Sequence, residues 1–199
     1  MSVPELQFPI DRRMAPGQFG ATGASPVQIA RRRDAVAQIT ARKGQANAVI
    51  RKIADALRLD LPEPGYAVGA GEVTAVWIAP ATWLVLRPWS ATADLARGLA
   101  AICGTSASVV DQSAGKIVLR LSGAKARDVL AKGCRVDLHP RVFGPGRAAV
   151  TPIAHIPAVV QQVDATPAFD LIVPSTLAED FFEWLCVSAA EFGYEIPAG

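Results

Sequence analysis

The side chains that could do chemistry in this sequence are few, and their spacing matches no known catalytic or metal-binding motif. The three cysteines are Cys103, Cys134 and Cys186, and the two histidines are His139 and His155. Cys134 and His139 could act as a nucleophile and its base, but a cysteine beside a helix end and a turn more often serves packing. A zinc site would need distant ligands, because neither histidine has a Cys or His neighbour at metal-binding spacing. The sequence therefore predicts no catalytic residue and no metal ligand on this chain.

Two glycine triplets are the next candidates for ligand binding. Gly69–Gly71 and Gly144–Gly146 each read G-x-G, but both lack the third glycine of a dinucleotide fingerprint. No glycine-rich loop ends in Lys-Ser or Lys-Thr, as a P-loop would. The sequence favours neither kind of nucleotide site and leaves cofactor-binding residues unassigned.

Two pairs of polar and aromatic residues have both a structural and a functional interpretation. Asp111 and Ser113 suit a turn, because short polar side chains accept hydrogen bonds from the backbone two residues on. Asp111 could instead contact a ligand amine. Trp77 and Trp83 could form an aromatic platform, but their β-prone surroundings favour the core or a subunit interface.

The basic residues are unevenly distributed. Residues 1–60 carry ten Lys and Arg against five Asp and Glu, whereas residues 61–199 carry ten against thirteen. This asymmetry predicts a basic N-terminal face that could meet an acidic partner. Arg31–Arg33 has no interleaved aromatic residues, so a solvated strand end is favoured over a nucleic acid site.

A second group of basic residues follows the middle of the chain. The group consists of Lys132, Arg135, Arg141 and Arg147, and it could bind an anionic ligand or an acidic partner. Asp128 and Asp137 lie among them, so the sequence favours a surface of mixed charge.

Length and composition predict a folded protein with a substantial core. The chain has 199 residues, of which 51% are hydrophobic, enough for one domain or two closely associated halves. An odd number of widely spaced cysteines predicts reduced thiols. The longest apolar stretch, Ala75–Leu86, is interrupted by Pro80, and the N-terminus lacks the pattern of a signal peptide. We therefore expect a soluble cytoplasmic protein that does not enter a membrane.

The elements that must position these residues begin after an N-terminal arm. Residues 1–26 are rich in proline and glycine, and residues 27–199 form the expected folded domain. Apolar residues such as Phe8, Ile10 and Phe19 could dock the arm on another surface, although a disordered arm is equally compatible with the sequence.

Hydrophobic periodicity predicts α+β structure in the first half of the domain. Alternation over residues 35–42 predicts a strand, and apolar residues at helical spacing predict a helix from Gln45 to Leu57. Glu72–Ile78 and Trp83–Arg87 read as a hairpin. Asp94–Cys103 reads as a short helix that Gly104 ends.

The second half repeats a similar order. Strands are expected at Ala107–Val110, Lys116–Leu121, Ala148–Ile156, Ala158–Val163 and Phe169–Val173. We expect Ser122 to cap a helix that ends at a left-handed Gly133, and Thr176 with Glu179 to form a capping box for the last helix. These elements predict a mainly antiparallel sheet with packed helices, for which two ferredoxin-like halves are one arrangement.

Several segments, taken in order, resemble the gamma-subunit family of heterotetrameric sarcosine oxidases over roughly residues 15–192. They are Gly17–Gly20, Trp77–Leu84, Val109–Ser113, Leu119–Cys134, Asp137–Pro140 and Phe169–Ser175. The sequence departs from the family pattern at Ala114, where a larger polar residue is expected, and at Pro174, where Arg is usual. That family is related to the folate-binding domain of glycine-cleavage aminomethyltransferases, so the resemblance implies their α+β fold.

The resemblance also implies a function that the residues alone do not. Such a chain would be a noncatalytic gamma subunit in a complex that demethylates sarcosine to glycine, transfers the one-carbon unit to tetrahydrofolate and forms hydrogen peroxide. FAD, FMN, NAD and zinc would be bound by its partners, which are large alpha and beta flavoprotein subunits and a small zinc-binding delta subunit. Two alternatives are the gamma subunit of a related N-methyl amino-acid oxidase or dehydrogenase, and a stand-alone folate-binding protein.

Overall fold

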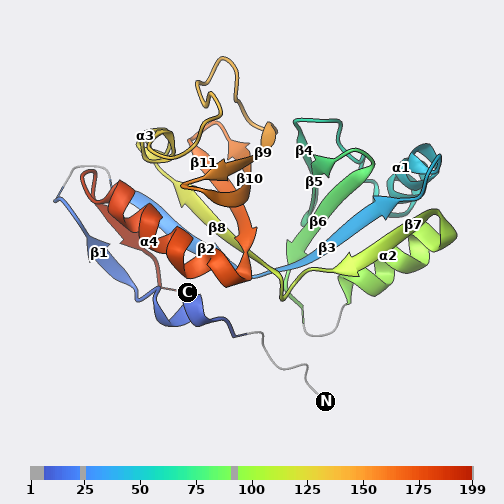
Figure 1. Cartoon of the computed structure of the whole chain (residues 1–199), viewed down its shortest axis with the longest axis horizontal. Coiled ribbons are helices and arrows are strands. Elements are labelled where there is room, and N and C mark those ends of the chain that lie inside the picture. Colours follow the sequence, from blue (N-terminus) through green and yellow to red (C-terminus); the bar gives the residue numbers. More distant parts are fainter. Residues whose placement is uncertain (1–6, 23–25, 91–93, 199) are drawn as a thin grey trace. The chain divides into compact units, whose positions relative to one another are not determined.

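The computed structural model describes residues 7–22, 26–90 and 94–198, which divide into two compact units (Figure 1). In the described part of the chain, the first unit is residues 33–90 and 94–114, and the second unit is residues 7–22, 26–32 and 115–198. The described part of the chain therefore begins in the second unit, passes through the first unit and returns to the second. Among the described helices, none has the length and apolar character needed to cross a membrane.

The first unit is a five-stranded antiparallel sheet with strand order β4-β5-β6-β3-β7 and two helices. Its elements are β3 (Asp34–Ala41), α1 (Ala46–Leu57), β4 (Ala67–Ala70), β5 (Val73–Ala79), β6 (Thr82–Pro88), α2 (Leu95–Cys103), the 3-10 helix η2 (Gly104–Ser106) and β7 (Ala107–Asp111). Without the edge strand β4, the connectivity is β-α-β-β-α-β, which is the ferredoxin-like motif. The first unit is therefore one ferredoxin-like half with an added edge strand.

The core of the first unit lies between its helices and one face of its sheet. Val49 and Ile53 of α1 and Leu99 of α2 are fully buried there against the strands. The amide of Arg97 donates to the Asp94 side chain at the start of α2, and Gly104 ends the helix with a φ of 56°. The helix that periodicity predicts in this region is thereby confirmed at both ends.

The second unit is a seven-stranded sheet with order β1-β12-β2-β8-β11-β10-β9, in which only the β12–β2 pair is parallel. Its elements are η1 (Pro9–Arg12), β1 (Gly17–Phe19), β2 (Val27–Arg32), β8 (Lys116–Ser122), α3 (Ala126–Ala131), β9 (Ala148–Ile153), β10 (Ile156–Asp164), β11 (Ala168–Pro174), η3 (Ser175–Leu177), α4 (Ala178–Ala189) and β12 (Tyr194–Ile196). The order β8-α3-β10-β11-α4-β12 is ferredoxin-like again, with β2 inserted between β8 and β12. The α+β fold with two ferredoxin-like halves is therefore confirmed.

The part of the N-terminal arm that the structure describes packs on the second unit. Ile10 of η1 is buried in the core of that unit, and β1 forms the outer strand of the sheet (Figure 1). The amide of Ala21 donates to the carbonyl of Ala190 over 2.8 Å. Leu6, a further apolar residue of the arm that the sequence offers for docking, lies outside the described residues.

Three predicted helix boundaries are wrong. α3 begins after Lys125 with no side-chain cap, so Ser122 does not cap it. Gly133 is not among the residues with positive φ; a Cβ atom there would lie 2.6 Å from Cζ2 of Trp184, so glycine serves close packing. No side-chain cap precedes α4 either, because η3 leads directly into it and replaces the expected capping box.

Strand assignments differ from the sequence in two respects. The predicted strand Ala148–Ile156 is split by a turn at Ala154 and His155, whose φ values are 49° and 68°. The sequence did not predict β1, β2, β4 or β12. β1, β4 and β12 are three or four residues long, and β2 ends in arginines, so the strands lack a strong periodic pattern.

Candidate functional site

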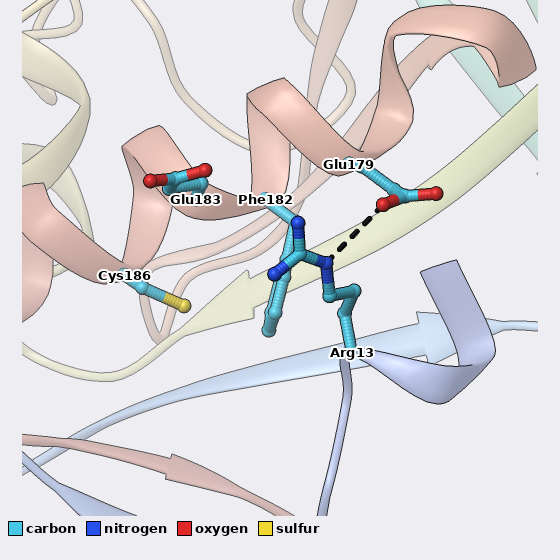
Figure 2. Close-up of a pocket in the computed structure, with 5 residues that line it drawn as sticks. All are labelled: Arg13, Glu179, Phe182, Glu183 and Cys186. Atoms are coloured by element: carbon cyan, nitrogen blue, oxygen red, sulfur yellow. Dashed lines mark hydrogen bonds and ion pairs between the residues drawn. The ribbon is translucent and has the colours of Figure 1, made fainter. Parts of the chain in front are cut away.

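The second unit contains a pocket between the N-terminal arm and α4. Its volume is about 240 Å³, and its lining residues are Arg13, Glu179, Phe182, Glu183 and Cys186. Figure 2 shows Arg13 reaching from the arm towards α4, which supplies the rest of the lining. Arg13 from the N-terminal arm and four side chains from α4 thus line the same pocket.

Local structure explains why these side chains share the pocket. The α4 residues are spaced three and four positions apart, so they lie on one face of the helix. Arg13 is held near that face because η1 is anchored. Asp11 accepts a hydrogen bond from the Phe8 amide over 3.0 Å and pairs with Arg31, whose guanidinium lies 4.6 Å from the centre of the Phe8 ring.

The pocket carries a net negative charge. Arg13 Nε lies 3.2 Å from Glu179 Oε2, and these side chains are 64% and 39% exposed. Glu183 is exposed and forms no ion pair with any residue that the structure describes. One arginine thus faces two carboxylates, and the pair that it forms is solvent-exposed and weak.

Cys186 is a poor nucleophile in this pocket. Burial raises the pKa of its thiol, a hydrogen bond with the Tyr194 side chain lowers it, and the nearby Glu183 carboxylate raises it further. A raised pKa lowers the fraction of thiolate at neutral pH, and the thiolate is the form that attacks electrophiles, so this thiol reacts slowly. The pocket is therefore suited to binding rather than covalent chemistry.

The structure places Cys134 and His139 in separate structural roles. Burial raises the pKa of the Cys134 thiol, and Cys134 forms a β-bridge with Ile153. His139 belongs to a turn, in which its amide donates to Asp137 Oδ1 over 2.9 Å and its Nδ1 accepts from the Arg141 amide over 3.3 Å. No hydrogen bond joins Cys134 to His139 in the described part of the chain.

Metal-ligating side chains are scattered. Within residues 7–22, 26–90 and 94–198, no group of three or more His, Cys, Asp and Glu side chains could hold an ion. Burial raises the pKa of Cys103 as well, and His155 occupies the tight turn between β9 and β10. The histidines and cysteines that the sequence offers are not brought together.

The other candidates from the sequence take structural positions. Asp111 Oδ1 accepts from the Ser113 amide over 2.8 Å, which is the turn that the sequence predicts. Trp83 is buried and donates its Nε1 hydrogen to the carbonyl of Pro62 over 2.9 Å, and Trp77 packs partly buried against the same core. Gly71 and Gly146, with φ values of 58° and 79°, belong to turns that lead into strands.

The basic residues do not form a shared anion site. Lys132 Nζ lies 2.5 Å from Glu191 Oε1 and also donates to the carbonyl of Ser188, so it serves the end of α4. Arg135 and Arg141 are exposed, whereas Arg147 is half-buried. The four basic residues that could have bound an anionic ligand together thus occupy separate structural positions.

Sequence reasoning missed a buried ion network in the second unit. Asp170 is 1% exposed; it receives Nε and Nη2 of Arg120 over 2.8 and 2.9 Å and Nη1 of Arg32 over 2.5 Å. Gln161 Nε2 lies 3.4 Å from the same carboxylate. The available signal was a single Asp inside the apolar run of β11, where a charged side chain needs a partner.

Comparison with known proteins gives consistent results. A family model described as "Sarcosine oxidase, gamma subunit family" matches residues 42–191. Sarcosine oxidase subunit gamma from Arthrobacter sp. is 38% identical over 144 residues, which cover 70% of this chain and 69% of that protein. A chain of the heterotetrameric sarcosine oxidase from Corynebacterium sp. U-96 in complex with pyrrole 2-carboxylate superposes with a TM-score of 0.76 at 26% identity, covering 92% of both chains.

A more distant structure shares the fold. Glycine cleavage system aminomethyltransferase T from Bartonella henselae superposes with a TM-score of 0.57 at 13% identity. The match covers 91% of the present chain but 50% of the aminomethyltransferase chain. At this identity the similarity concerns the fold alone, and it agrees with the two ferredoxin-like units.

Proposed function

Because the chain belongs to the sarcosine oxidase gamma subunit family, we propose that it is the gamma subunit of a heterotetrameric sarcosine oxidase. The complex would demethylate sarcosine to glycine, pass the one-carbon unit to tetrahydrofolate and form hydrogen peroxide. The observation that carries this proposal is the match over 92% of both chains to a chain of a solved heterotetrameric sarcosine oxidase. The role belongs to sarcosine catabolism and one-carbon metabolism.

We infer that this chain contributes no catalytic residue to the complex. Burial raises the pKa of all three cysteine thiols, which makes them weak nucleophiles. The histidines lie in turns, and Asp111 is engaged with the Ser113 amide. These engagements support a scaffold that stabilises its partners.

The cofactors belong to partner subunits in this proposal. The partners are large alpha and beta flavoprotein subunits that hold FAD, FMN and NAD, and a small delta subunit that holds zinc. The donor set supports placing zinc elsewhere, because the described residues offer no cluster of three ligands. Tetrahydrofolate would be a co-substrate of the complex, and a cytoplasmic location stays a prediction from the widely spaced cysteines.

Co-purification tests the assignment directly. The tagged chain would be coexpressed with the alpha, beta and delta subunits, and the expected product is a yellow complex of fixed stoichiometry that forms hydrogen peroxide from sarcosine. Dimethylglycine and N-methylglutamate are the comparison substrates, because substrate choice lies on another chain. If the tagged chain is purified without flavoprotein partners, the proposal fails; saturable tetrahydrofolate binding by the isolated chain would then favour a stand-alone folate-binding protein.

A further inference from the structure

We propose that the pocket between the arm and α4 receives a lysine or arginine side chain from a partner subunit. The proposal rests on the proposed function, because it requires that the chain work inside a complex. It adds the place on this chain and the chemistry of the partner group. The pocket is defined by Arg13, Glu179, Phe182, Glu183 and Cys186 (Figure 2).

Charge is the first argument for a cationic guest. Glu179 is already paired with Arg13 over 3.2 Å, but Glu183 has no ion-pair partner among the described residues. A cation placed in the pocket would pair with Glu183 and bring the net charge of the site to zero. An anion would face the two carboxylates with a single arginine to offset them. Electrostatic complementarity of this kind fixes the register of an interface and selects its partner.

The walls of the pocket suit the long stem of such a side chain. Phe182 is 6% exposed and Cys186 is half-buried, so they form a largely apolar wall beside the carboxylates. Lysine and arginine bury their methylene stems along apolar surface while the charged end remains with polar groups. The pocket offers both kinds of contact along one helix face.

The exposure of the pocket favours a guest delivered by a protein surface. Small-molecule sites enclose most of their ligand, whereas Arg13, which forms one wall here, is 64% exposed. Val187 follows Cys186 on α4 and is 70% exposed, so an apolar side chain stands beside the acidic pocket. An apolar contact next to a charged anchor is the arrangement that interfaces bury.

Three matched variants test the sign of the charge effect. Each variant would compete with wild-type chain for a limiting amount of the partner subunits, and the ratio of the two chains in the purified complex gives the relative affinity. Glu183→Gln should weaken assembly by about threefold to tenfold. Asp180→Asn removes an exposed carboxylate from the same turn of α4 outside the pocket and should change affinity by less than about twofold. Arg13→Gln should strengthen assembly, because it makes the pocket more acidic.

Opposite results overturn the proposal. Weaker assembly of Arg13→Gln together with stronger assembly of Glu183→Gln would identify an anionic guest, and equal behaviour of the Glu183 and Asp180 variants would exclude a specific cation site. Circular dichroism must show that each variant folds. If wild-type chain itself does not assemble, the proposed function fails instead of the pocket assignment.

A second measurement does not depend on substitution. The sulfur of Cys186 lines the pocket, so a bound partner side chain should slow its alkylation by a maleimide in the assembled complex relative to the isolated chain. Peptide mass spectrometry separates this site from Cys103 and Cys134. Equal labelling of Cys186 in the two states would show that the pocket stays empty on assembly.

Discussion

The carboxylate of Asp170 offers a direct test of how the second unit is held together. Asp170 lies on β11 with Arg120 of β8 opposite it on one side and Gln161 of β10 opposite it on the other. Arg120 binds it through two nitrogens, and Arg32 of β2 adds a third contact over 2.5 Å. One buried carboxylate therefore connects four neighbouring strands.

The substitution Asp170→Asn removes the negative charge and keeps the shape of the side chain. Removing one partner of a buried ion pair costs about 3–5 kcal/mol of unfolding free energy, because the remaining charge is left without compensation. The side chains of Arg32 and Arg120 are 22% and 35% exposed, so water offsets part of this loss. We expect a loss of about 2–4 kcal/mol, which lowers the thermal midpoint by about 5–15 °C for a chain of this size.

Thermal and urea unfolding followed by circular dichroism would measure the effect. Asp128→Asn is the matched control, because Asp128 is 52% exposed and pairs with Lys125 over 2.9 Å. Loss of such a surface pair should cost no more than about 1 kcal/mol. If Asp170→Asn were no more destabilising than the control, the ion network would not be a main support of the sheet.

The remaining predictions concern close packing and pH. Gly133→Ala should destabilise the chain by about 1–3 kcal/mol in urea unfolding, because the new methyl group meets the Trp184 ring. Gly98→Ala should instead stabilise the chain by about 0.5–1 kcal/mol, because Gly98 is helical and nothing lies within 4 Å of its added Cβ. Burial and the hydrogen bond with Cys186 raise the pKa of Tyr194 to about 12 from 10.0, so folding favours the protonated phenol. This stabilisation is present below pH 10 and is lost as pH rises towards 12. The absorbance titration of the wild-type chain minus that of Tyr194→Phe should show a midpoint near 12. A midpoint near 10 would contradict the assignment.

Hydrophobic periodicity was sufficient to predict the helices and strands that bury a single apolar face. α1 places Val49 and Ile53 in the core at helical spacing, and the β5–β6 hairpin follows from two β-prone segments. β2 escaped prediction because its arginines suggested a solvated end, although Arg31 and Arg32 pair with Asp11 and Asp170. The carboxylates that pair with these arginines lie in other segments of the chain. The local sequence of β2 therefore does not reveal the ion pairs.

The candidate site could not be predicted from the sequence for a similar reason. Arg13 and Glu179, which meet at the pocket, are 166 positions apart. The acidic residues at the start of α4 read as ordinary favourable charges near a helix N-terminus. Only the docking of η1, through Ile10 and the Asp11–Arg31 pair, adds the second wall. The resemblance to a family predicted the assembly, whereas tertiary packing was needed to reveal the pocket.

The contacts of the N-terminal basic residues determine which positive charges the chain can present to its partners. Arg31 and Arg32 pair with Asp11 and Asp170, and Lys52 donates to the carbonyl of Cys103 and to Ser106 Oγ. These three residues thus make internal contacts, whereas Arg42, Lys43 and Arg51 are exposed, so the basic N-terminal face stays a prediction.

The acidic residues of α4 have a different position. Asp180 and Glu183 are exposed on the surface, and Glu183 borders an apolar wall beside Val187. Exposed charges are weak stabilisers of a fold but strong selectors of a partner, because like charges are repelled and opposite charges are drawn into register. Because Asp180 and Glu183 are exposed on α4, this helix should select a basic surface on a partner, which is the surface that the Glu183 and Arg13 variants are designed to detect.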